Sequence, residues 1–208
     1  MGPENSRSRQ LLQSMVDEIE GDATIVWGRS QNKLDQLMIL KEANILVPRF
    51  SIDRQELMCT VEGDVWGRKI NHSQGRDIKF PGDRGYERSD YYVEPIRDVK
   101  NEWRVHVFDG LSIHAQYKFR AEHSSDPKST VIKSRRMGWR LRRDLELPPR
   151  VRAIAKNAVA ALQWDLGAVD LLECNGGKIF VLEVNSRPGL DSRTTEQYVK
   201  AIRRKLNV

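Results

Sequence analysis

Residues 168–190 read AVDLLECNGGKIFVLEVNSRPGL, in which two apolar runs flank the turn-forming residues CNGG at positions 174–177. Apolar runs on both sides of a glycine-containing turn predict a β-hairpin. Because side chains alternate between the two faces of a strand, Glu183 and Asn185 should leave the same face. Asp170 lies on the other arm of the hairpin. We therefore expect the three side chains to converge on one patch of sheet.

This predicted patch combines two carboxylates with one carboxamide. Oxygen donors of this kind suit a hard cation such as Mg²⁺, which takes few protein ligands and completes its shell with water and phosphate oxygens. The alternative is that the three side chains are solvent-facing polar residues on a half-exposed hairpin. Residue chemistry alone leaves both interpretations open.

The rest of the chain alternates strands, hairpins and helices, which predicts an α+β fold with antiparallel strand pairs. Residues 102–120 predict a second hairpin, with its turn at the Asp-Gly dipeptide at 109–110. Strands are further predicted at 23–27, 64–70 and 91–96, and helices at 10–20, 32–44, 151–167 and 194–206. Asn32, before an apolar run, is expected to begin the helix at 32–44, and Gly167 is expected to end the long helix at 151–167.

The composition is that of a globular protein, with 39% hydrophobic and 31% charged residues among 208. No run approaches the roughly 18 to 20 apolar residues of a membrane span, and the N-terminus lacks the apolar core of a signal peptide. With only two cysteines, neither a disulfide framework nor a zinc site is predicted, and we expect a cytoplasmic protein. The net charge of +6 and pI near 9.4 favour an anionic partner, either nucleotide or nucleic acid.

The hairpin sequence closely resembles the C-terminal signature of the ATP-grasp carboxylate–amine ligases, in particular the ribosomal-protein glutamate ligase type. That signature has Val-Asp, a turn, and Glu-Val-Asn-x-x-Pro-Gly-Leu. The resemblance implies the ATP-grasp fold, in which two α+β subdomains with antiparallel sheets sandwich a nucleotide. It also implies that Asp170, Glu183 and Asn185 bind Mg²⁺, with Mn²⁺ as the alternative ion.

Upstream segments resemble the same family in the expected order. The strand and glycine-containing loop at 64–77 resemble the segment that covers the ATP phosphates. Residues 91–96 resemble the hinge strand that contacts adenine. Residues 102–104 resemble the segment whose acidic residue binds ribose. The implied nucleotide contacts are Arg68, Lys69, Gly75, Glu94, Ile96 and Glu102. Where the family has a lysine this chain has Arg68 followed by Lys69, so which cation meets the phosphates is left open.

The resemblance further implies a set of cations that stabilise charge on the transferring phosphoryl group. The implied catalytic residues are Arg104, Lys118, Arg135, Arg136 and Arg187. Arg104 and Lys118 lie on facing arms of the 102–120 hairpin, whereas the two arginines at 135–136 belong to a loosely aligned basic loop. Lys33 matches a recurrent Asn-Lys pair of the family, and we expect a structural role for it.

These expectations describe an ATP- and Mg²⁺-dependent ligase that activates a carboxylate as an acyl phosphate, joins it to an amine, and releases ADP and phosphate. The carboxylate donor and amine acceptor are not named by the sequence; either could be a peptide, a protein or a nucleic-acid-linked group. The predicted organisation is a tail with a short helix at 1–22, a first subdomain at 23–92 and a second at 93–208, without a full N-terminal domain. The alternative is a non-catalytic nucleic-acid-binding protein on an ATP-grasp-like scaffold.

Overall fold

The computed structural model describes residues 31–70, 78–121, 132–133 and 137–206, together with the single residues 10 and 128. The predicted strand at 23–27, the predicted phosphate loop at 71–77 and all but the first residue of the predicted N-terminal helix lie outside the described residues. None of the helices in the described ranges is long and apolar enough to cross a membrane.

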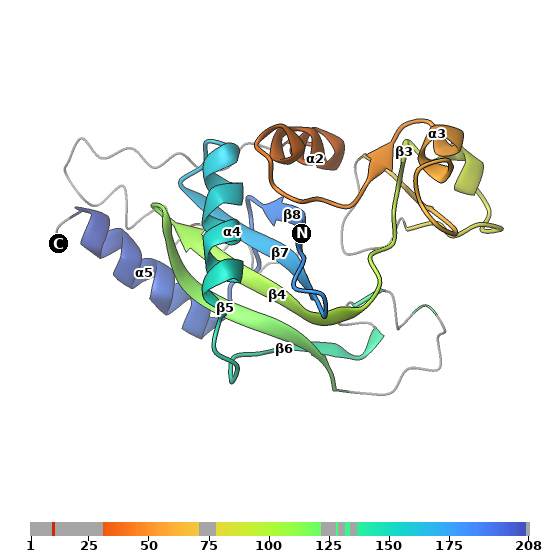
Figure 1. The fold of residues 1–208 in the computed structure, drawn as a ribbon. Coiled ribbons are helices and arrows are strands. Elements are labelled where there is room, and N and C mark those ends of the chain that lie inside the picture. The colour runs from red at the N-terminus through yellow and green to blue at the C-terminus, as the bar shows by residue number, and fades with distance from the viewer. Residues whose placement is uncertain are drawn as a thin grey trace.

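A five-stranded sheet forms the centre of the molecule (Figure 1). In spatial order its strands are β6 (Trp139–Arg142), β5 (Leu111–Arg120), β4 (Val99–Phe108), β7 (Leu166–Cys174) and β8 (Ile179–Asn185). Every neighbouring pair is antiparallel. Between β4 and β5, Asp109 and Gly110 both have positive φ angles, of 49° and 68°, as a two-residue hairpin turn of matching twist requires. Both predicted hairpins are confirmed.

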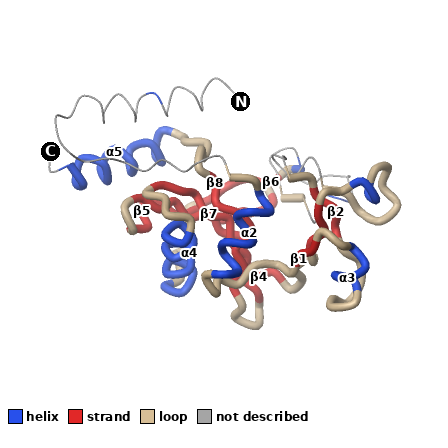
Figure 2. The backbone as a smooth tube through the Cα atoms, turned by 90° about the horizontal axis from the view of Figure 1, so that it is seen from above, coloured by secondary structure: helices blue, strands red, loops and turns tan. Residues whose placement is uncertain are grey.

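The two faces of this sheet are covered by different helices (Figure 2). Helix α4 (Pro149–Ala161) covers one face and buries Val151, Ala155 and Ala158 in the main core. Helix α5 (Ser192–Leu206) lies on the opposite face, where Tyr198 and Ile202 pack in a smaller apolar cluster. The predicted helix that begins near residue 151 is therefore a core helix.

The predicted role of Gly167 as the end of the long helix is wrong. Helix α4 ends at Ala161, and Gln163, with φ of 57°, adopts the left-handed conformation that follows it. Gly167 instead lies within β7, where a Cβ atom would come within 2.7 Å of Val184 Cγ1. Glycine is required there because a neighbouring strand packs closely, not because a helix ends.

A second, three-stranded sheet lies at the other end of the molecule (Figure 1). It is ordered β1 (Phe50–Ser51), β3 (Tyr91–Val93), β2 (Trp66–Arg68), and the five-residue helix α3 (Arg54–Met58) and the short 3₁₀ helix η1 (Tyr86–Arg88) accompany it. Its own apolar core comprises Leu57, Val61, Val65, Tyr86 and Tyr92. The strand predicted at 91–96 stops at Val93, since Pro95 has no N–H to donate to a ladder.

Helix α2 (Lys33–Glu42) lies beside β8, at the edge of the large sheet. Asn32 caps it by accepting a hydrogen bond from the backbone N–H of Asp35 at 2.8 Å, as its position before the apolar run predicted. Leu37 and Leu40 bury themselves in the core beneath α4. These contacts fix α2 against the strand that carries the predicted metal ligands.

Candidate active site on the large sheet

A β-bulge in β8 aligns Glu183 with Asp170. Leu171 lies opposite Val181, but Asp170 lies opposite Glu183, so that Leu182 is an additional residue on β8. Without the bulge, Leu182 would lie opposite Asp170 and Glu183 would point to the other face of the sheet, because a shift of one residue reverses every side chain. The bulge therefore brings the two predicted carboxylate ligands to one face, a placement for which bulges beside functional sites are known.

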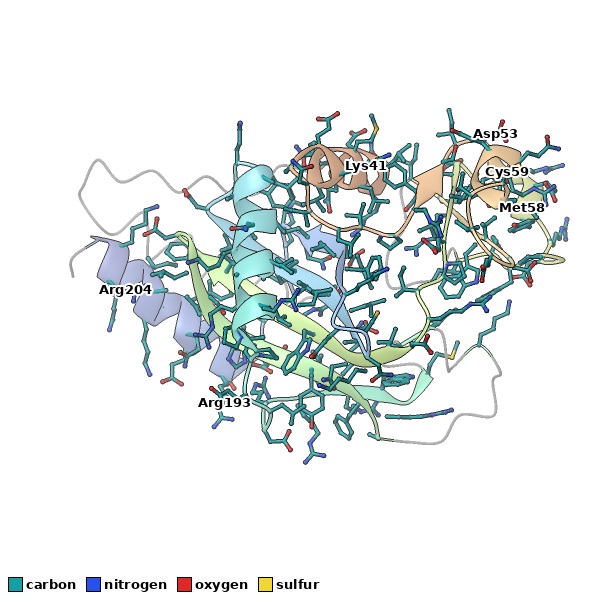
Figure 3. All side chains as sticks on the ribbon, in the orientation of Figure 1. Lys41, Asp53, Met58, Cys59, Arg193 and Arg204 are labelled. Carbon is teal, nitrogen blue, oxygen red and sulfur yellow. The ribbon has the colours of Figure 1, made fainter. Side chains whose placement is uncertain are left out.

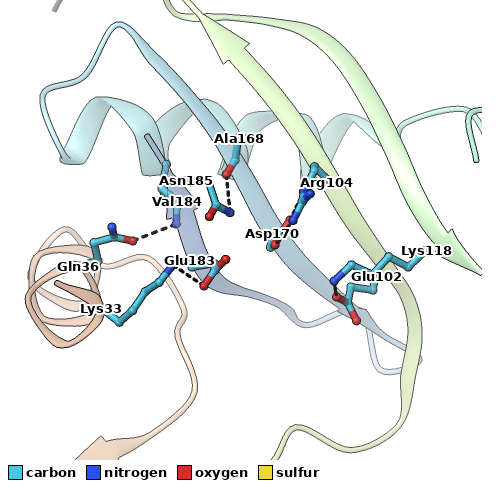
Figure 4. Close-up of polar contacts among 10 residues, drawn as sticks. All are labelled: Lys33, Gln36, Glu102, Arg104, Lys118, Ala168, Asp170, Glu183, Val184 and Asn185. Atoms are coloured by element: carbon cyan, nitrogen blue, oxygen red, sulfur yellow. Dashed lines mark hydrogen bonds and ion pairs between the residues drawn. The ribbon is translucent and has the colours of Figure 1, made fainter. Parts of the chain in front are cut away.

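Asp170 is held by a two-point ion pair with Arg104, its direct neighbour on β4 (Figure 4). Arg104 Nε donates to Oδ1 at 2.8 Å and Nη2 donates to Oδ2 at 2.7 Å. Burial raises the pKa of Asp170, but the guanidinium outweighs burial, and the resulting pKa lies below its usual range. The same contact raises the pKa of Arg104. Asp170 is therefore ionised at neutral pH.

Glu183 contacts the ammonium group of Lys33, from the first turn of α2 (Figure 4). Burial and the charge of Asp170 raise the pKa of Glu183, but Lys33 and a hydrogen bond from Asn185 together leave it below its usual value. Asn185 lies on the same face, and its Nδ2 lies 3.5 Å from the carbonyl oxygen of Ala168. The family resemblance predicted a structural role for Lys33. The sequence feature that points to this residue is the Asn-Lys pair at the start of α2.

Glu102 is a third carboxylate on this face, two residues before Arg104 on β4. It is buried, and it contacts Lys118 on β5 and Lys133, whose Nζ lies 3.5 Å away. Burial alone would lower the pKa of Lys118, but Asp170 and Glu102 raise it above its usual value. The face thus interleaves carboxylates with cations: Glu102, Asp170 and Glu183 with Lys33, Arg104, Lys118 and Lys133.

Arg68 and Lys69, the two candidates for the phosphate contact, have different neighbours on the small sheet. Lys69 binds Asp90 at 2.7 Å and the carbonyl oxygen of Arg88, both on the small sheet. Arg68 lies directly opposite Tyr91, whose ring belongs to the core of the large sheet. Burial raises the pKa of Tyr91, while the nearby charge of Arg68 lowers it. Arg68 therefore shares the face of Tyr91 that is turned toward the large sheet.

Glu94, the predicted hinge glutamate, is engaged with Arg49 next to β1. Arg49 donates from Nε at 3.0 Å and from Nη2 at 2.9 Å, and the backbone N–H of Glu94 donates to Arg49 O at 2.8 Å. The hydrogen bonds from the Arg49 side chain are the main cause that lowers the pKa of Glu94. Ile96, two residues further on, is half-buried. Glu94 thus joins β1 to the segment that leads into the large sheet.

The remaining predicted residues are less informative. Arg187 is exposed, two residues beyond Asn185, whereas Gly75, Arg135 and Arg136 lie outside the described residues. Within the described ranges no three His, Cys, Asp or Glu side chains form a metal-binding group. The candidate donor set is instead two carboxylates and one carboxamide, oxygen ligands that fit Mg²⁺ because it keeps several water or phosphate ligands of its own.

No family model and no curated protein sequence matches the chain, but solved structures do. D-alanine–D-alanine ligase from Bacillus anthracis is 17% identical, with a TM-score of 0.61 over 85% of this chain and 68% of that one. The ATP-grasp ligase PsnB, solved with a minimal precursor, Mg and ADP, is 16% identical, with a TM-score of 0.57 over 81% and 57%. This chain has the ATP-grasp fold.

The ATP-grasp fold predicted from the hairpin signature is therefore confirmed. N5-carboxyaminoimidazole ribonucleotide synthetase from Thermotoga maritima matches as well, at 17% identity and a TM-score of 0.58, over 86% of this chain and 49% of that one. The chain spans little more than half the length of PsnB. The finer resemblance to ribosomal-protein glutamate ligases stays a prediction.

Proposed function

We propose that this protein is an ATP- and Mg²⁺-dependent ligase that joins a carboxylate to an amine. The observation that carries the proposal is the bulged hairpin of an ATP-grasp fold, which presents Asp170, Glu183 and Asn185 on one face beside half-buried cations. These three residues would hold Mg²⁺, with Mn²⁺ as the alternative. When bound, the ion neutralises phosphate charge during transfer. Residues 23–92 and 93–208 would enclose the nucleotide as two subdomains.

In the proposed reaction a substrate carboxylate oxygen attacks the γ-phosphorus, the bond to ADP breaks, and an acyl phosphate forms. The amine then attacks the acyl carbon and phosphate leaves, so that no protein nucleophile is required. Arg104 and Lys118 supply positive charge fixed in a buried setting, where it stabilises developing negative charge without reorganisation. Their raised pKa values keep both groups protonated while amine and phosphate exchange protons.

We assign the phosphate contact on the small sheet to Arg68. It lies opposite Tyr91, on the face turned toward the large sheet, and this placement supports the assignment. Arg68 would grip phosphate oxygens with its planar fork. The remaining contacts assigned by resemblance stay predictions: Gly75, Glu94, Ile96 and Glu102 for nucleotide, and Arg135, Arg136 and Arg187 for catalysis.

A peptide is the substrate class that the comparisons favour. PsnB has been solved with a precursor peptide, and D-alanine–D-alanine ligase is named for joining two amino acids. Peptides carry both carboxylate and amine groups. A peptide donor or acceptor therefore heads the candidates, ahead of a whole protein or a nucleic-acid-linked group.

Calorimetric titration of ATP, with and without Mg²⁺, tests the proposal. Wild type should bind ATP in a Mg²⁺-dependent manner, and Glu183→Gln should weaken that binding at least about tenfold. Glu173→Gln is the matched control, because Glu173 lies on β7 but contacts Asn101 and Trp103 instead of the site. Absence of Mg²⁺-dependent binding by wild type would overturn the proposal, and AMP in place of ADP as product would exclude the acyl phosphate route.

Nucleic-acid binding is the second candidate, favoured by exposed cations along α5. Arg193 and Arg204 lie near its two ends (Figure 3), and Lys200 and Arg203 are exposed between them. Binding through such a stripe would weaken steeply with salt, because it releases counterions from phosphates. Salt-sensitive binding of duplex or single strands, retained in Glu183→Gln, would support this function.

A further inference from the structure

Gln36 is a buried polar side chain of α2 that reaches the edge of the large sheet. It is 4% exposed, and its Oε1 accepts a hydrogen bond from the backbone N–H of Val184 at 3.0 Å (Figure 4). Val184 lies between Glu183 and Asn185. The contact therefore holds the backbone of the segment that carries two of the three proposed metal ligands.

The bulge in β8 explains why this strand needs an acceptor from outside the sheet. Along its outer edge the N–H of Val181 donates to the carbonyl oxygen of Leu46 at 2.9 Å, and the next outward donor is Val184. Outward N–H groups of a regular strand recur at every second residue. The spacing of three follows from the additional residue Leu182, where the local ladder is disrupted.

Lys33 and Gln36 form a paired contact from one side of α2. They are three residues apart, and residues at this spacing are neighbours on a helix surface. Lys33 contacts the carboxylate of Glu183, and Gln36 contacts the backbone of the next residue. Leu37 and Leu40 anchor the helix in the main core, so that both contacts come from a fixed support.

We propose that Gln36 is a positioning residue that fixes the β8 bulge and thereby aims Glu183 and Asn185 at the metal that Asp170 shares. The inference rests on the proposed function and deepens it. Loss of the acceptor leaves the N–H of Val184 buried without a partner. A shift in strand register, or a turn of this peptide group toward water, would then lower the free energy of the segment. Either change would move the metal ligands.

Three variants separate positioning from ordinary stability. Gln36→Leu removes the acceptor, and Gln36→Glu keeps an oxygen acceptor. Leu40→Ala truncates a core side chain of the same helix and leaves Gln36 in place. The first readout is exchange of the Val184 backbone amide by NMR in nucleotide-free protein. In Gln36→Leu the exchange of the Val184 amide should accelerate more than the exchange of the Val181 amide. In Gln36→Glu the Val184 amide should still exchange slowly.

The second readout is the Mg²⁺ concentration that half-saturates ATP binding, measured by calorimetry on folded protein. Gln36→Leu should raise it about tenfold to a hundredfold, the range for residues that orient metal ligands, while Leu40→Ala should change it less than about threefold. Unchanged Val184 exchange in Gln36→Leu, or an equal effect of Leu40→Ala on Mg²⁺, would overturn the inference.

The two hypotheses fail in different ways. If wild type binds no Mg²⁺-dependent ATP, the proposed function is overturned, and the amide exchange still decides whether Gln36 holds the bulge. If wild type binds ATP with Mg²⁺ and Gln36→Leu binds equally well, the positioning role is overturned and the proposed function stands.

Discussion

The two faces of the large sheet are built from the same strands, but one is apolar and the other carries ion pairs. On β4, Trp103 and Val105 point to the α4 face and are fully buried among apolar side chains, whereas Glu102 and Arg104 point to the other face and form ion pairs. Alternation of side chains along a strand allows this separation. One face supplies apolar burial, the main source of stability, and leaves the other to concentrate charge.

The charged face changes character along its length. Beyond Arg104, His106 is fully buried and its Nδ1 lies 3.1 Å from the hydroxyl of Tyr198 on α5. Burial lowers the pKa of His106 to about 3, so the imidazole is neutral at physiological pH. Phe108 then packs in the apolar cluster under α5. The ion pairs of Glu102, Asp170 and Glu183 thus lie on the half of the face away from the apolar cluster under α5.

The largest effect on stability should come from the α4 face. Leu171 is fully buried on β7, and Leu171→Ala should lower the free energy of unfolding by about 2–5 kcal/mol, because it removes apolar contacts and leaves a cavity. Urea denaturation measures this loss. A loss below about 1 kcal/mol would show that the core can collapse around the site, and would break the contrast between the faces.

Its chain neighbour Asp170 points to the other face, and its substitution should weaken nucleotide binding as well as stability. Asp170→Asn keeps the shape but leaves Arg104 facing a neutral group, and we expect a stability loss of about 1–3 kcal/mol. Mg²⁺-dependent ATP binding should weaken at least about tenfold, whereas folded Leu171→Ala should retain it. Equal nucleotide binding by both variants would contradict the assignment of the site to this face.

The pH dependence of stability sharpens the same contrast. The pKa values of Asp170 and Glu183 are lowered in the folded protein, so their ion pairs stabilise it above their ordinary pKa of about 4 and lose that contribution as the pH falls through the lowered values. The stability difference between wild type and Asp170→Asn should shrink as the pH falls from about 6 to about 3. Leu171→Ala should show a constant difference.

The smallest effect should come from ion pairs at the surface. Lys200 and Glu196 are four residues apart on α5, with side chains 65% and 58% exposed. Water and salt screen such a pair, and Lys200→Ala should leave the thermal midpoint unchanged within error. A clear decrease would mean that ion pairs stabilise this protein regardless of burial.

Much of the fold was predictable because its signals are local. Asn32 before an apolar run predicted the start of α2, and the Asp-Gly dipeptide predicted the hairpin turn. The exceptions arose where packing overrides local preference. Glycine commonly follows the end of a helix, yet the close contact with Val184 explains why Gly167 lies in β7.

The sequence names the candidate ligands but not the contacts that support them. Glu183 and Asn185 stand out as polar residues in an apolar run, and the family resemblance named Arg104 and Lys118. Gln36 carried no signal, because a single glutamine in an amphipathic helix is ordinarily exposed and its partner is 148 residues away. The Asn-Lys pair indicated a structural role for Lys33, but its contact with Glu183 depends on where α2 packs against β8.

The sequence by itself determined the two hairpins, the start of α2 and the helical periodicity of α4, and it named the candidate oxygen donors. Each of these follows from turn chemistry, periodicity or residue type over a few neighbours. Only the tertiary structure decided the bulge at Leu182, the side to which Arg68 turns and the contacts of α2 with β8. These depend on strand register and helix docking, which are set by the balance of packing and hydrogen bonding across the whole sheet.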